Sequence, residues 1–550
     1  MRPSLLIRRM EPIYFSVKMG LNMSQTLEIQ NLKNITKLLG AQIKANNLQI
    51  LTIASGMVTV QASKENHREI IKELLVNDHK TALVAITGLD LGQTLGIYYH
   101  MRTSLGYLTI KVEVPKEKPE IQTISDLISG ATFAELEASD LLGIIFEGNI
   151  RHNHFILSEN WPEGVYPLRK DVKIEEVKLN PPSFKEETED ENVYKLIIGP
   201  QHPALIEPEK FSVTVAGEIV TNVEPRIGYV HRGIEKAAES RTYQRDIFLV
   251  ERVCGICNST HARTFVAAVE KILGVDIPPR AKYIRIIALE LNRLHSHLLT
   301  LGHACIEMGY ETLFQYFWRD REPVMDLIEL TSGNRVYSSL MTIGGVRRDL
   351  NQDDFPKIRT ILNELHKKVP SYRDTYQNNK SLRLRMDGVG VLSREDALKL
   401  CCVGPVARGS GLDIDVRKDT PYEAYNEIPF KEIVYTEGDT WARMNVRLDE
   451  VEESIKIIQY ALDHMPDGPI KTAIPRIMPS GEAIASVEAP RGELFYYVKS
   501  NGTQKPDRVK VRTPTYANLP SFLKTAIGQN LADCPVNFVS LDPCFSCTDR

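Results

Sequence analysis

The 550-residue sequence lacks any uninterrupted apolar segment long enough to cross a bilayer. It also lacks a strong charge imbalance, because the formal net charge is −4. Nucleic-acid-binding proteins normally present a strongly basic face, so no nucleic acid is expected among the partners. The basic N-terminus contains no apolar stretch followed by a small-residue cleavage site, and residues 1–24 are therefore predicted to be a flexible extension.

Cysteine is scarce and unevenly placed, with eight residues in the chain. No secretory signal accompanies them, so a disulfide framework is not expected. Four of them form two C-x-x-C pairs, Cys254 with Cys257 and Cys544 with Cys547. The other four stand in no motif and are interpreted as buried structural thiols.

The length indicates two or more domains, and the hydrophobic content of 43% is typical of a globular protein. We predict an α+β fold with a small N-terminal α/β domain over residues 25–172. Segments 58–63, 82–89 and 106–115 predict strands, and 123–148 predicts helices broken by glycines. An acidic, proline-containing linker is predicted over 173–195.

A larger, mainly helical domain is predicted over residues 196–550. It begins with a strand pair, and the apolar residues on most faces of 282–317 predict a long buried helix. Amphipathic helices are predicted near 357–369 and 452–464. From about Ala483 onward the pattern predicts strands and loops.

The two cysteine pairs indicate a site for a soft metal. Gly255 permits a tight turn between the first two sulfurs, and Ser259 or Thr260 is expected to cap a helix that ends at Gly274. A helix N-terminus lowers the pKa of nearby thiols. Spacing alone leaves zinc, an iron–sulfur cluster and nickel open, and two pairs weaken a thioredoxin-like interpretation.

The full strings around these cysteines carry a resemblance to a known family. ERVCGICNSTH and DPCFSC resemble the paired signatures of [NiFe]-hydrogenase large subunits. GPQHPAL (199–205), GYVHRGIEK (228–236), GGVRRDL (344–350) and EAPRGEL (488–494) also look like family motifs, several of them like the 49-kDa quinone-site subunit of respiratory complex I. The N-terminal domain, with its PLRKD string, resembles the 30-kDa subunit of that complex. Such a fusion resembles the catalytic large subunit of complex-I-related (group 4) hydrogenases of the formate hydrogenlyase type.

Two alternatives stand beside this interpretation. A fused 30/49-kDa subunit of complex I would share the architecture and reduce quinone, but such subunits lack the four cysteine ligands. A scaffold that only docks iron–sulfur partners would be expected to have lost one or more ligands, and all four are present.

The resemblance implies a nickel–iron centre whose iron carries carbon monoxide and cyanide. Cys254 and Cys544 would be terminal nickel ligands, and Cys257 and Cys547 would bridge nickel and iron. The sulfur of Cys544 is expected to be the base that accepts a proton. His261, one helical turn after Cys257, is expected to donate a hydrogen bond to a bridging sulfur, the alternative being an ordinary helix histidine.

Further roles follow from the same resemblance. Arg491 is expected over the metals beside Pro490, the alternative being a surface or ion-paired arginine. Thr515 is expected to bind a cyanide, and Asp542 to pair with Arg491 or to be an ordinary turn residue. Glu207, with Glu209 nearby, is predicted to be the first proton relay beyond Cys544.

Glu235 matches a glutamate that binds a distal magnesium ion or a water network in many relatives. Those relatives end the second motif with histidine, whereas this chain has Arg550, which argues against magnesium. Members of this subgroup are cut by a maturation protease after nickel insertion. The end at Arg550 is therefore interpreted as the processed form, the alternative being a gene without the tail.

No cysteine set remains for an iron–sulfur cluster in this chain, so electrons are expected to leave through another polypeptide. The resemblance implies an iron–sulfur small subunit like the 20-kDa subunit of complex I, a ferredoxin-like subunit and antiporter-like membrane subunits. The chain would then lie peripherally on the cytoplasmic side of the membrane. The expected reaction is the reversible conversion of protons and electrons to H₂, coupled to formate, carbon monoxide or ferredoxin oxidation, with formate dehydrogenase as the leading donor.

Overall fold

The computed structural model describes residues 49–54, 57–150, 154–181, 194–202 and 205–550. The predicted N-terminal extension and most of the predicted linker lie outside these residues. The mixture of a sheet-rich N-terminal part and a larger helical part confirms the α+β prediction, while the domain boundaries themselves stay a prediction. Among the described helices, none is both long and apolar enough to cross a bilayer.

The N-terminal part, here called the sheet module, is built on one five-stranded sheet in the order β1-β2-β5-β4-β3. Its strands are β1 (Gln49–Ala54), β2 (Met57–Gln61), β3 (Ala82–Asp90), β4 (Thr94–Thr103) and β5 (Gly106–Pro115). The pairing is antiparallel except between β2 and β5. The three predicted strands are confirmed, and β4 was missed.

Two helices and a small two-stranded sheet complete the sheet module: α3 (His67–Asn77), α4 (Ala131–Leu142), β6 (Glu120–Gln122) and β7 (Ile145–Glu147). Helix α4 begins after Gly130 and stops at Gly143, whose φ of +75° is the left-handed conformation that ends helices. Residues 123–129 are not helical and Ile145–Glu147 form strand β7, so the helices predicted before Gly130 and after Gly143 were wrong. There the buried Glu135 carboxylate accepts the backbone N–H of Ile124, which holds a turn in place of a helix.

The sheet module is followed by η1 (Ile174–Glu176), and the larger part begins with a three-stranded antiparallel sheet. Its strands are β8 (Tyr194–Ile198), β9 (Lys210–Ala216) and β10 (Ile219–Arg226). The predicted strand pair is confirmed, with β10 added as a hairpin partner of β9.

The body that follows is helical and is built around the buried helix α8. Its elements are α5 (Ile234–Ala238), α6 (Tyr243–Glu251), α7 (Asn258–Leu273), α8 (Pro279–Glu307), α9 (Glu311–Ser332), β11 (Met341–Thr342), β12 (Gly345–Val346), η2 (Gln352–Asp354), α10 (Phe355–Asn378), α11 (Lys380–Met386), α12 (Arg394–Lys399), α13 (Gly404–Gly409), α14 (Val416–Asp419) and α15 (Thr440–His464). The helices predicted near 357–369 and 452–464 are confirmed as parts of α10 and α15.

The predicted single helix over 282–317 is divided between α8 and α9. Gly309, with φ of +77°, adopts the left-handed backbone between them and reverses the chain. The apolar pattern continues across this break because α8 is buried on nearly every face and the apolar face of α9 follows it, so periodicity did not reveal the break.

The C-terminal part forms a second antiparallel sheet and four short helical segments. These are β13 (Ser480–Ala489), β14 (Gly492–Asn501), β15 (Pro506–Arg512), α16 (Pro514–Ala526), η3 (Leu531–Asp533), α17 (Cys534–Ser540) and α18 (Phe545–Asp549). The prediction of strands was right for the sheet and wrong for the helices. Short helices that are buried on most sides carry no amphipathic period to recognise.

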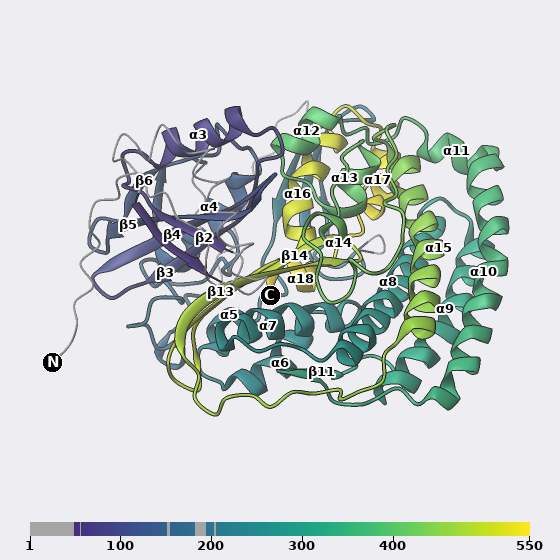
Figure 1. The fold of residues 1–550 in the computed structure, drawn as a ribbon. Helices are drawn as coiled ribbons and strands as arrows, with labels where there is room; N and C mark the ends of the chain where they lie inside the picture. The colour runs from purple at the N-terminus through teal and green to yellow at the C-terminus, as the bar shows by residue number, and fades with distance from the viewer. Residues whose placement is uncertain (1–48, 55–56, 151–153, 182–193, 203–204) are drawn as a thin grey trace.

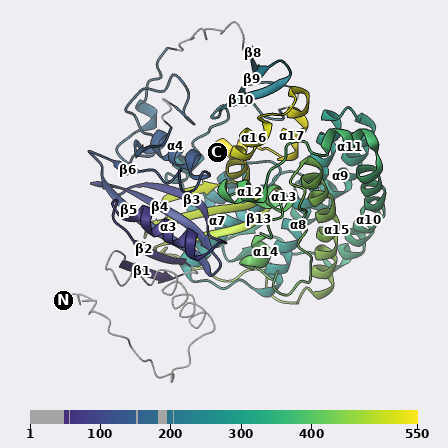
Figure 2. The same cartoon turned by 90° about the horizontal axis from the view of Figure 1, so that it is seen from above.

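The sheet module packs on the C-terminal sheet. Val84 and Tyr98 form one apolar cluster with Ile484, Phe495 and Tyr497 of β13 and β14. In both views the sheet module lies on one side, helices α10 and α15 lie on the other, and the C-terminus lies between them (Figures 1 and 2). The last residues of the chain are thus enclosed by both parts of the molecule.

We predict that Gly404→Ala destabilises the protein far more than Gly388→Ala. Both glycines have left-handed backbones, with φ of +64° and +68°, so alanine costs each about 1–2 kcal/mol. A Cβ at residue 404 would also lie 2.4 Å from Cα of Gly492, whereas nothing lies within 4 Å of one at residue 388. Overpacking adds about 1–3 kcal/mol. Thermal unfolding of both variants measures the difference, and equal melting temperatures would contradict the close packing.

Candidate metal centre

The four motif cysteines meet in one buried cluster. Sγ of Cys254 lies 3.4 Å from Sγ of Cys544, and Sγ of Cys257 lies 3.6 Å from Sγ of Cys547. Each of the four residues is at most 4% exposed. Each close pair therefore joins one sulfur from the first motif to one sulfur from the second, 290 positions later in the sequence.

Short helices present these sulfurs. Cys257 is the N-cap of α7 and Cys544 is the N-cap of α18, while Cys547 lies within α18. The predicted end of α7 at Gly274 is confirmed, with φ of +65°. The predicted cap by Ser259 or Thr260 was wrong, because the hydroxyl of Thr260 donates to the carbonyl of Cys257 instead.

The four thiols titrate together because they share one dry site. Hydrogen bonds to its sulfur, from Cys257 first and then from Cys544 and Cys547, hold the pKa of Cys254 well below its ordinary value. The charge and hydrogen bond of Cys254 then raise the pKa of Cys544 well above the ordinary value. Without a further cation, the cluster therefore holds one thiolate and resists further deprotonation.

The donor set fits a soft metal. Cys254, Cys544 and Cys547 have sulfurs within 4.8 Å of one another, as do the ligand atoms of Cys257, His261 and Cys547. Thiolates are the ligands that nickel, iron and zinc all accept, so the sulfurs alone do not select among these metals. A bound cation would compensate the charge that disfavours deprotonating the remaining thiols.

Arg491 and Asp542 form an ion pair beside the sulfurs. The Arg491 Nη2 lies 2.7 Å from the Asp542 Oδ1, and its Nε donates to the Asp542 carbonyl at 2.8 Å. Burial opposes the charge on Arg491, but the negative charges of Asp542 and of the cysteine cluster raise its pKa well above the ordinary value. Pro490 precedes Arg491 in the buried turn between β13 and β14.

Several polar atoms at this ion pair have no hydrogen-bond partner in the described part of the chain. They are Nη1 of Arg491, Oδ2 of Asp542, and Nε and Nη2 of Arg447. Arg447, on α15, lies with its Nε 3.9 Å from Asp542 Oδ2. Buried polar groups are rarely left unpaired, so this set indicates that a polar ligand or ordered water completes the site.

His261 on α7 and Thr515 on α16 each contact one cysteine of the second pair. His261 Nε2 lies 3.6 Å from Sγ of Cys547, and its Nδ1 lies 2.7 Å from the hydroxyl of Tyr496. Burial lowers the pKa of His261 to about 4. The neutral ring can therefore accept from Tyr496 and donate to the sulfur. Thr515 accepts the backbone N–H of Cys544 at 3.2 Å, which leaves its hydroxyl proton available.

Glu207 reaches the turn between the last two cysteines. It accepts the backbone N–H of Ser546 at 2.7 Å and also the Ser546 hydroxyl. Glu209 is buried, and neither of its carboxylate oxygens has a hydrogen-bond partner among the described residues. Burial and the charge of Asp549 raise the pKa of Glu209 to about 10, so it is protonated at neutral pH.

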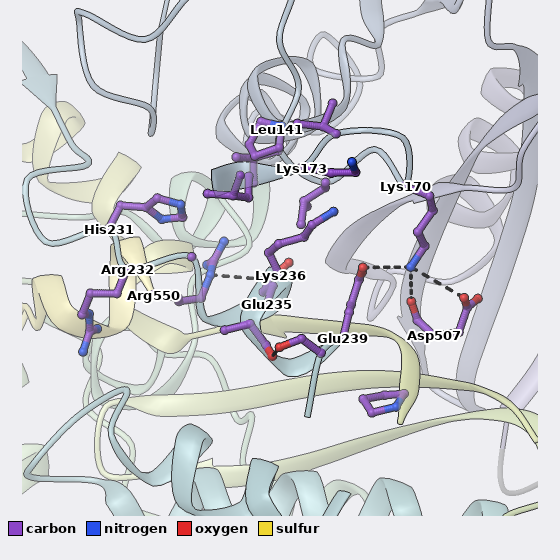
Figure 3. A pocket seen from close by; sticks show the side chains of 18 of the residues that line it. Leu141, Lys170, Lys173, His231, Arg232, Glu235, Lys236, Glu239, Asp507 and Arg550 are labelled. Carbon is purple, nitrogen blue, oxygen red and sulfur yellow. Dashed lines mark hydrogen bonds and ion pairs between the residues drawn. The ribbon is translucent and has the colours of Figure 1, made fainter. Parts of the chain in front are cut away.

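Glu235 lies farther from the sulfurs, on one wall of a cavity of about 870 Å³ between the sheet module and the helical body (Figure 3). Its carboxylate faces Arg508 at 2.8 Å, Arg550 at 3.4 Å and Lys510 at 3.6 Å. These cations hold the pKa of Glu235 down at about 2 despite burial. A carboxylate surrounded by three cations does not fit a magnesium ion.

The predicted site residues Glu207, His261, Arg491, Thr515 and Asp542 thus lie around the cysteine cluster, while Glu235 lies apart. Sequence reasoning missed Arg447, Tyr496 and Ser546. Arg447 and Tyr496 come from segments with no motif of their own, so no local signal could have identified them. Ser546 lies inside the second C-x-x-C pair and was overlooked.

Comparison with known proteins adds family membership to this geometry. Residues 232–305 match the nickel-dependent hydrogenase family, residues 60–178 match the 30-kDa subunit family of respiratory-chain NADH dehydrogenase, and 307–479 with 476–550 match its 49-kDa subunit family. Formate hydrogenlyase subunit 5 of Escherichia coli is 36% identical, with 82% of each chain covered. The fused C/D polypeptide of the NADH-quinone oxidoreductase of Bacteroides fragilis is also 36% identical, with 82% of this chain and 92% of the relative covered.

Two shorter relatives match the larger part of the chain. The carbon monoxide-induced hydrogenase of Rhodospirillum rubrum is 42% identical over 65% of this chain and 100% of its own. A polypeptide from the structure of an archaeal membrane-bound sulfane sulfur reductase has a TM-score of 0.64 and 34% identity, and the match covers 66% of this chain and 100% of that polypeptide.

The fold and the site together define a class: a nickel-dependent hydrogenase domain on a complex I 49-kDa framework, with a 30-kDa-like module fused before it. Identity alone does not separate the hydrogenases from the quinone-linked relatives, because both reach 36%. The first cysteine pair lies within the residues that match the nickel-dependent hydrogenase family, and all four motif cysteines meet in one buried cluster. The chain belongs to the family of complex-I-related [NiFe]-hydrogenase large subunits, as the sequence motifs predicted.

We predict that Cys544→Ser lowers the nickel content of the matured protein at least about tenfold, because a serine hydroxyl is a harder and far less acidic donor. Cys305→Ser is the matched control. Cys305 is also buried, and a serine there can keep the hydrogen bond to the Leu301 carbonyl. Elemental analysis of both variants measures the effect, and full nickel content in Cys544→Ser would contradict the assignment.

Proposed function

We propose that this chain catalyses the reversible reaction 2H⁺ + 2e⁻ ⇌ H₂ as the catalytic subunit of a membrane-associated, multisubunit hydrogenase. The observation that carries the proposal is the buried cluster of four cysteines at two matched Sγ–Sγ distances, 3.4 Å and 3.6 Å. All four, Cys254, Cys257, Cys544 and Cys547, would hold a nickel–iron centre through their sulfurs. When bound, that centre, with carbon monoxide and cyanide on the iron, supplies the redox chemistry and the polarisation of H₂.

The side chains around the cysteines would orient the sulfurs and the bound ligands, and would transfer protons. Cys544 would accept the proton released when H₂ is split, because thiolate sulfur is a basic donor that suits a soft, redox-active metal. Arg491, fixed by Asp542, offers the unpartnered Nη1 to a ligand, and the free hydroxyl proton of Thr515 offers a second donor. His261 would hold the Cys547 sulfur in place through its N–H.

Glu207 would carry the proton away from the site. It already binds Ser546, which lies between Cys544 and Cys547, and it is partly exposed. A partly exposed carboxylate next to a buried base can pass protons between the site and water. The buried, protonated Glu209 lies two positions farther along the same segment.

The electrons would leave through partner subunits. The named relatives are subunits of multisubunit complexes, and we propose an iron–sulfur small subunit, a ferredoxin-like subunit and antiporter-like membrane subunits around this chain, held at the cytoplasmic face of the membrane. Formate is the proposed electron source, with carbon monoxide or ferredoxin as the alternatives. With formate, the net reaction is HCOO⁻ + H⁺ → CO₂ + H₂.

The direct test is H₂ evolution by the purified complex with reduced methyl viologen as the electron donor. We expect wild-type activity and a complete loss in Cys544→Ser. Quinone reduction without H₂ evolution or consumption would contradict the proposal and favour a role like that of the quinone-linked relatives.

We also predict that Glu207→Gln slows H₂/D₂ exchange about a hundredfold or more while leaving the nickel content unchanged. The amide oxygen can still accept the Ser546 N–H, but the side chain can no longer carry a proton. The exposed Glu218 in the β9–β10 hairpin provides the control variant Glu218→Gln. A wild-type exchange rate in Glu207→Gln would remove this residue from the proton route.

A further inference from the structure

A buried charge cluster joins the sheet module to the helix that carries Cys547. Glu137, on α4, accepts hydrogen bonds from both Arg550 and Lys510. Arg550 follows directly after α18, and Lys510 lies on β15. The side chains of Glu137, Arg550 and Lys510 are at most 5% exposed. A residue from the small N-terminal part therefore holds the end of a metal-binding helix.

Helix α18 depends on such contacts for its position. It has only five residues, and isolated helices shorter than about 12–15 residues are marginal in water. The Asp549 carboxylate accepts the backbone N–H groups of Gly228 and Val230, at 2.9 Å and 3.0 Å. The Arg550 carbonyl accepts the backbone N–H of Arg232 at 3.1 Å. These contacts hold the backbone, while Glu137 and Glu235 hold the Arg550 side chain.

Glu137 also balances the positive charge of the cations that surround it. Three cations, Arg508, Lys510 and Arg550, surround the two carboxylates of Glu137 and Glu235, so the cluster carries one excess positive charge. Removing the charge of Glu137 would raise that excess among buried side chains, where an unpaired charge is costly. Among the described residues, the guanidinium of Arg550 would then keep only its longer ion pair, to Glu235 at 3.4 Å.

We propose that Glu137 is a positioning residue for the metal centre: by binding Arg550 it fixes α18, and so sets where the Cys547 sulfur lies. The sheet module is then part of the active-site framework. Its residue Glu137 contacts Arg550, which lies three residues after Cys547. The infrared measurement described below rests on the proposed function, because it needs the metal centre. The hydrogen-exchange measurement does not.

The test compares Glu137→Gln with Glu482→Gln in the purified complex. Glu482 also joins the two parts of the molecule, through Lys111, but it lies on β13 and its other hydrogen-bond partner is Tyr497 on β14. Two quantities are measured: amide hydrogen exchange in the peptide covering 544–550, and the infrared bands of the iron-bound carbon monoxide and cyanide. We expect Glu137→Gln to lower protection of that peptide at least about tenfold, because a charged hydrogen bond is lost, and to shift or split the bands. Glu482→Gln should change neither.

A double variant separates positioning from simple charge balance. Glu137→Gln with Lys510→Met restores the original excess of one positive charge but leaves Arg550 without its partner on α4. The melting temperature of both variants is measured as a third quantity. If Glu137 positions α18, the melting temperature recovers in the double variant while the exchange and the bands stay altered. Recovery of all three in the double variant, or unchanged exchange and bands in Glu137→Gln, would overturn the proposal.

Two further arms keep the result decisive. If Glu137→Gln does not assemble, Glu137→Asp keeps the charge and retracts it by one methylene, and a smaller loss of protection in peptide 544–550 is expected; wild-type protection would overturn the proposal. If wild-type protein shows no such infrared bands, the proposed function fails, and the exchange measurements still decide the role of Glu137.

Discussion

The structure depends on bringing four thiols from two distant segments into one buried site. Each added thiolate costs more than the last, because its neighbours are already negative and burial removes solvation. The lowered pKa of Cys254 and the raised pKa of Cys544 reflect this repulsion in the protein without metal. Arg491 supplies one compensating charge, and a bound cation must supply the rest. The cluster is therefore a site whose chemistry is completed by metal.

The remainder of the large part holds this site in place through buried arginines. Arg408 bonds Glu450 and Glu488, and Arg293 donates to the carbonyls of Glu488 and Ala489. These bonds fix the end of β13, from which the turn with Arg491 projects. Fully paired buried networks of this kind rigidify a site, because loss of one partner leaves an uncompensated charge. Buried ion pairs also hold the end of α18, where Glu137 and Glu235 bind Arg550.

Much of this could be predicted from the sequence, and the exceptions have physical causes. The ligand cysteines, Arg491, His261 and Glu207 stand in strings specific enough to name, and the structure brings them together. The pairing of Arg491 with Asp542 followed from the same strings. Arg447 could not be foreseen, because an arginine in an amphipathic helix looks like a surface residue until the helix is seen to be buried on that side. The break at Gly309 was hidden because apolar residues continue from α8 into α9. The short C-terminal helices were hidden because burial on most sides erases the amphipathic period. The anchoring of Arg550 by Glu137 joins residues 413 positions apart and is visible only in three dimensions.

The measurement that tests the central claim most directly is elemental analysis combined with infrared spectroscopy on the purified, matured complex. The account predicts nickel and iron in amounts equimolar with this chain, together with bands from carbon monoxide and cyanide bound to the iron. Zinc alone, or no metal and no such bands in properly matured protein, would contradict it and return the chain to the quinone-linked branch of its relatives.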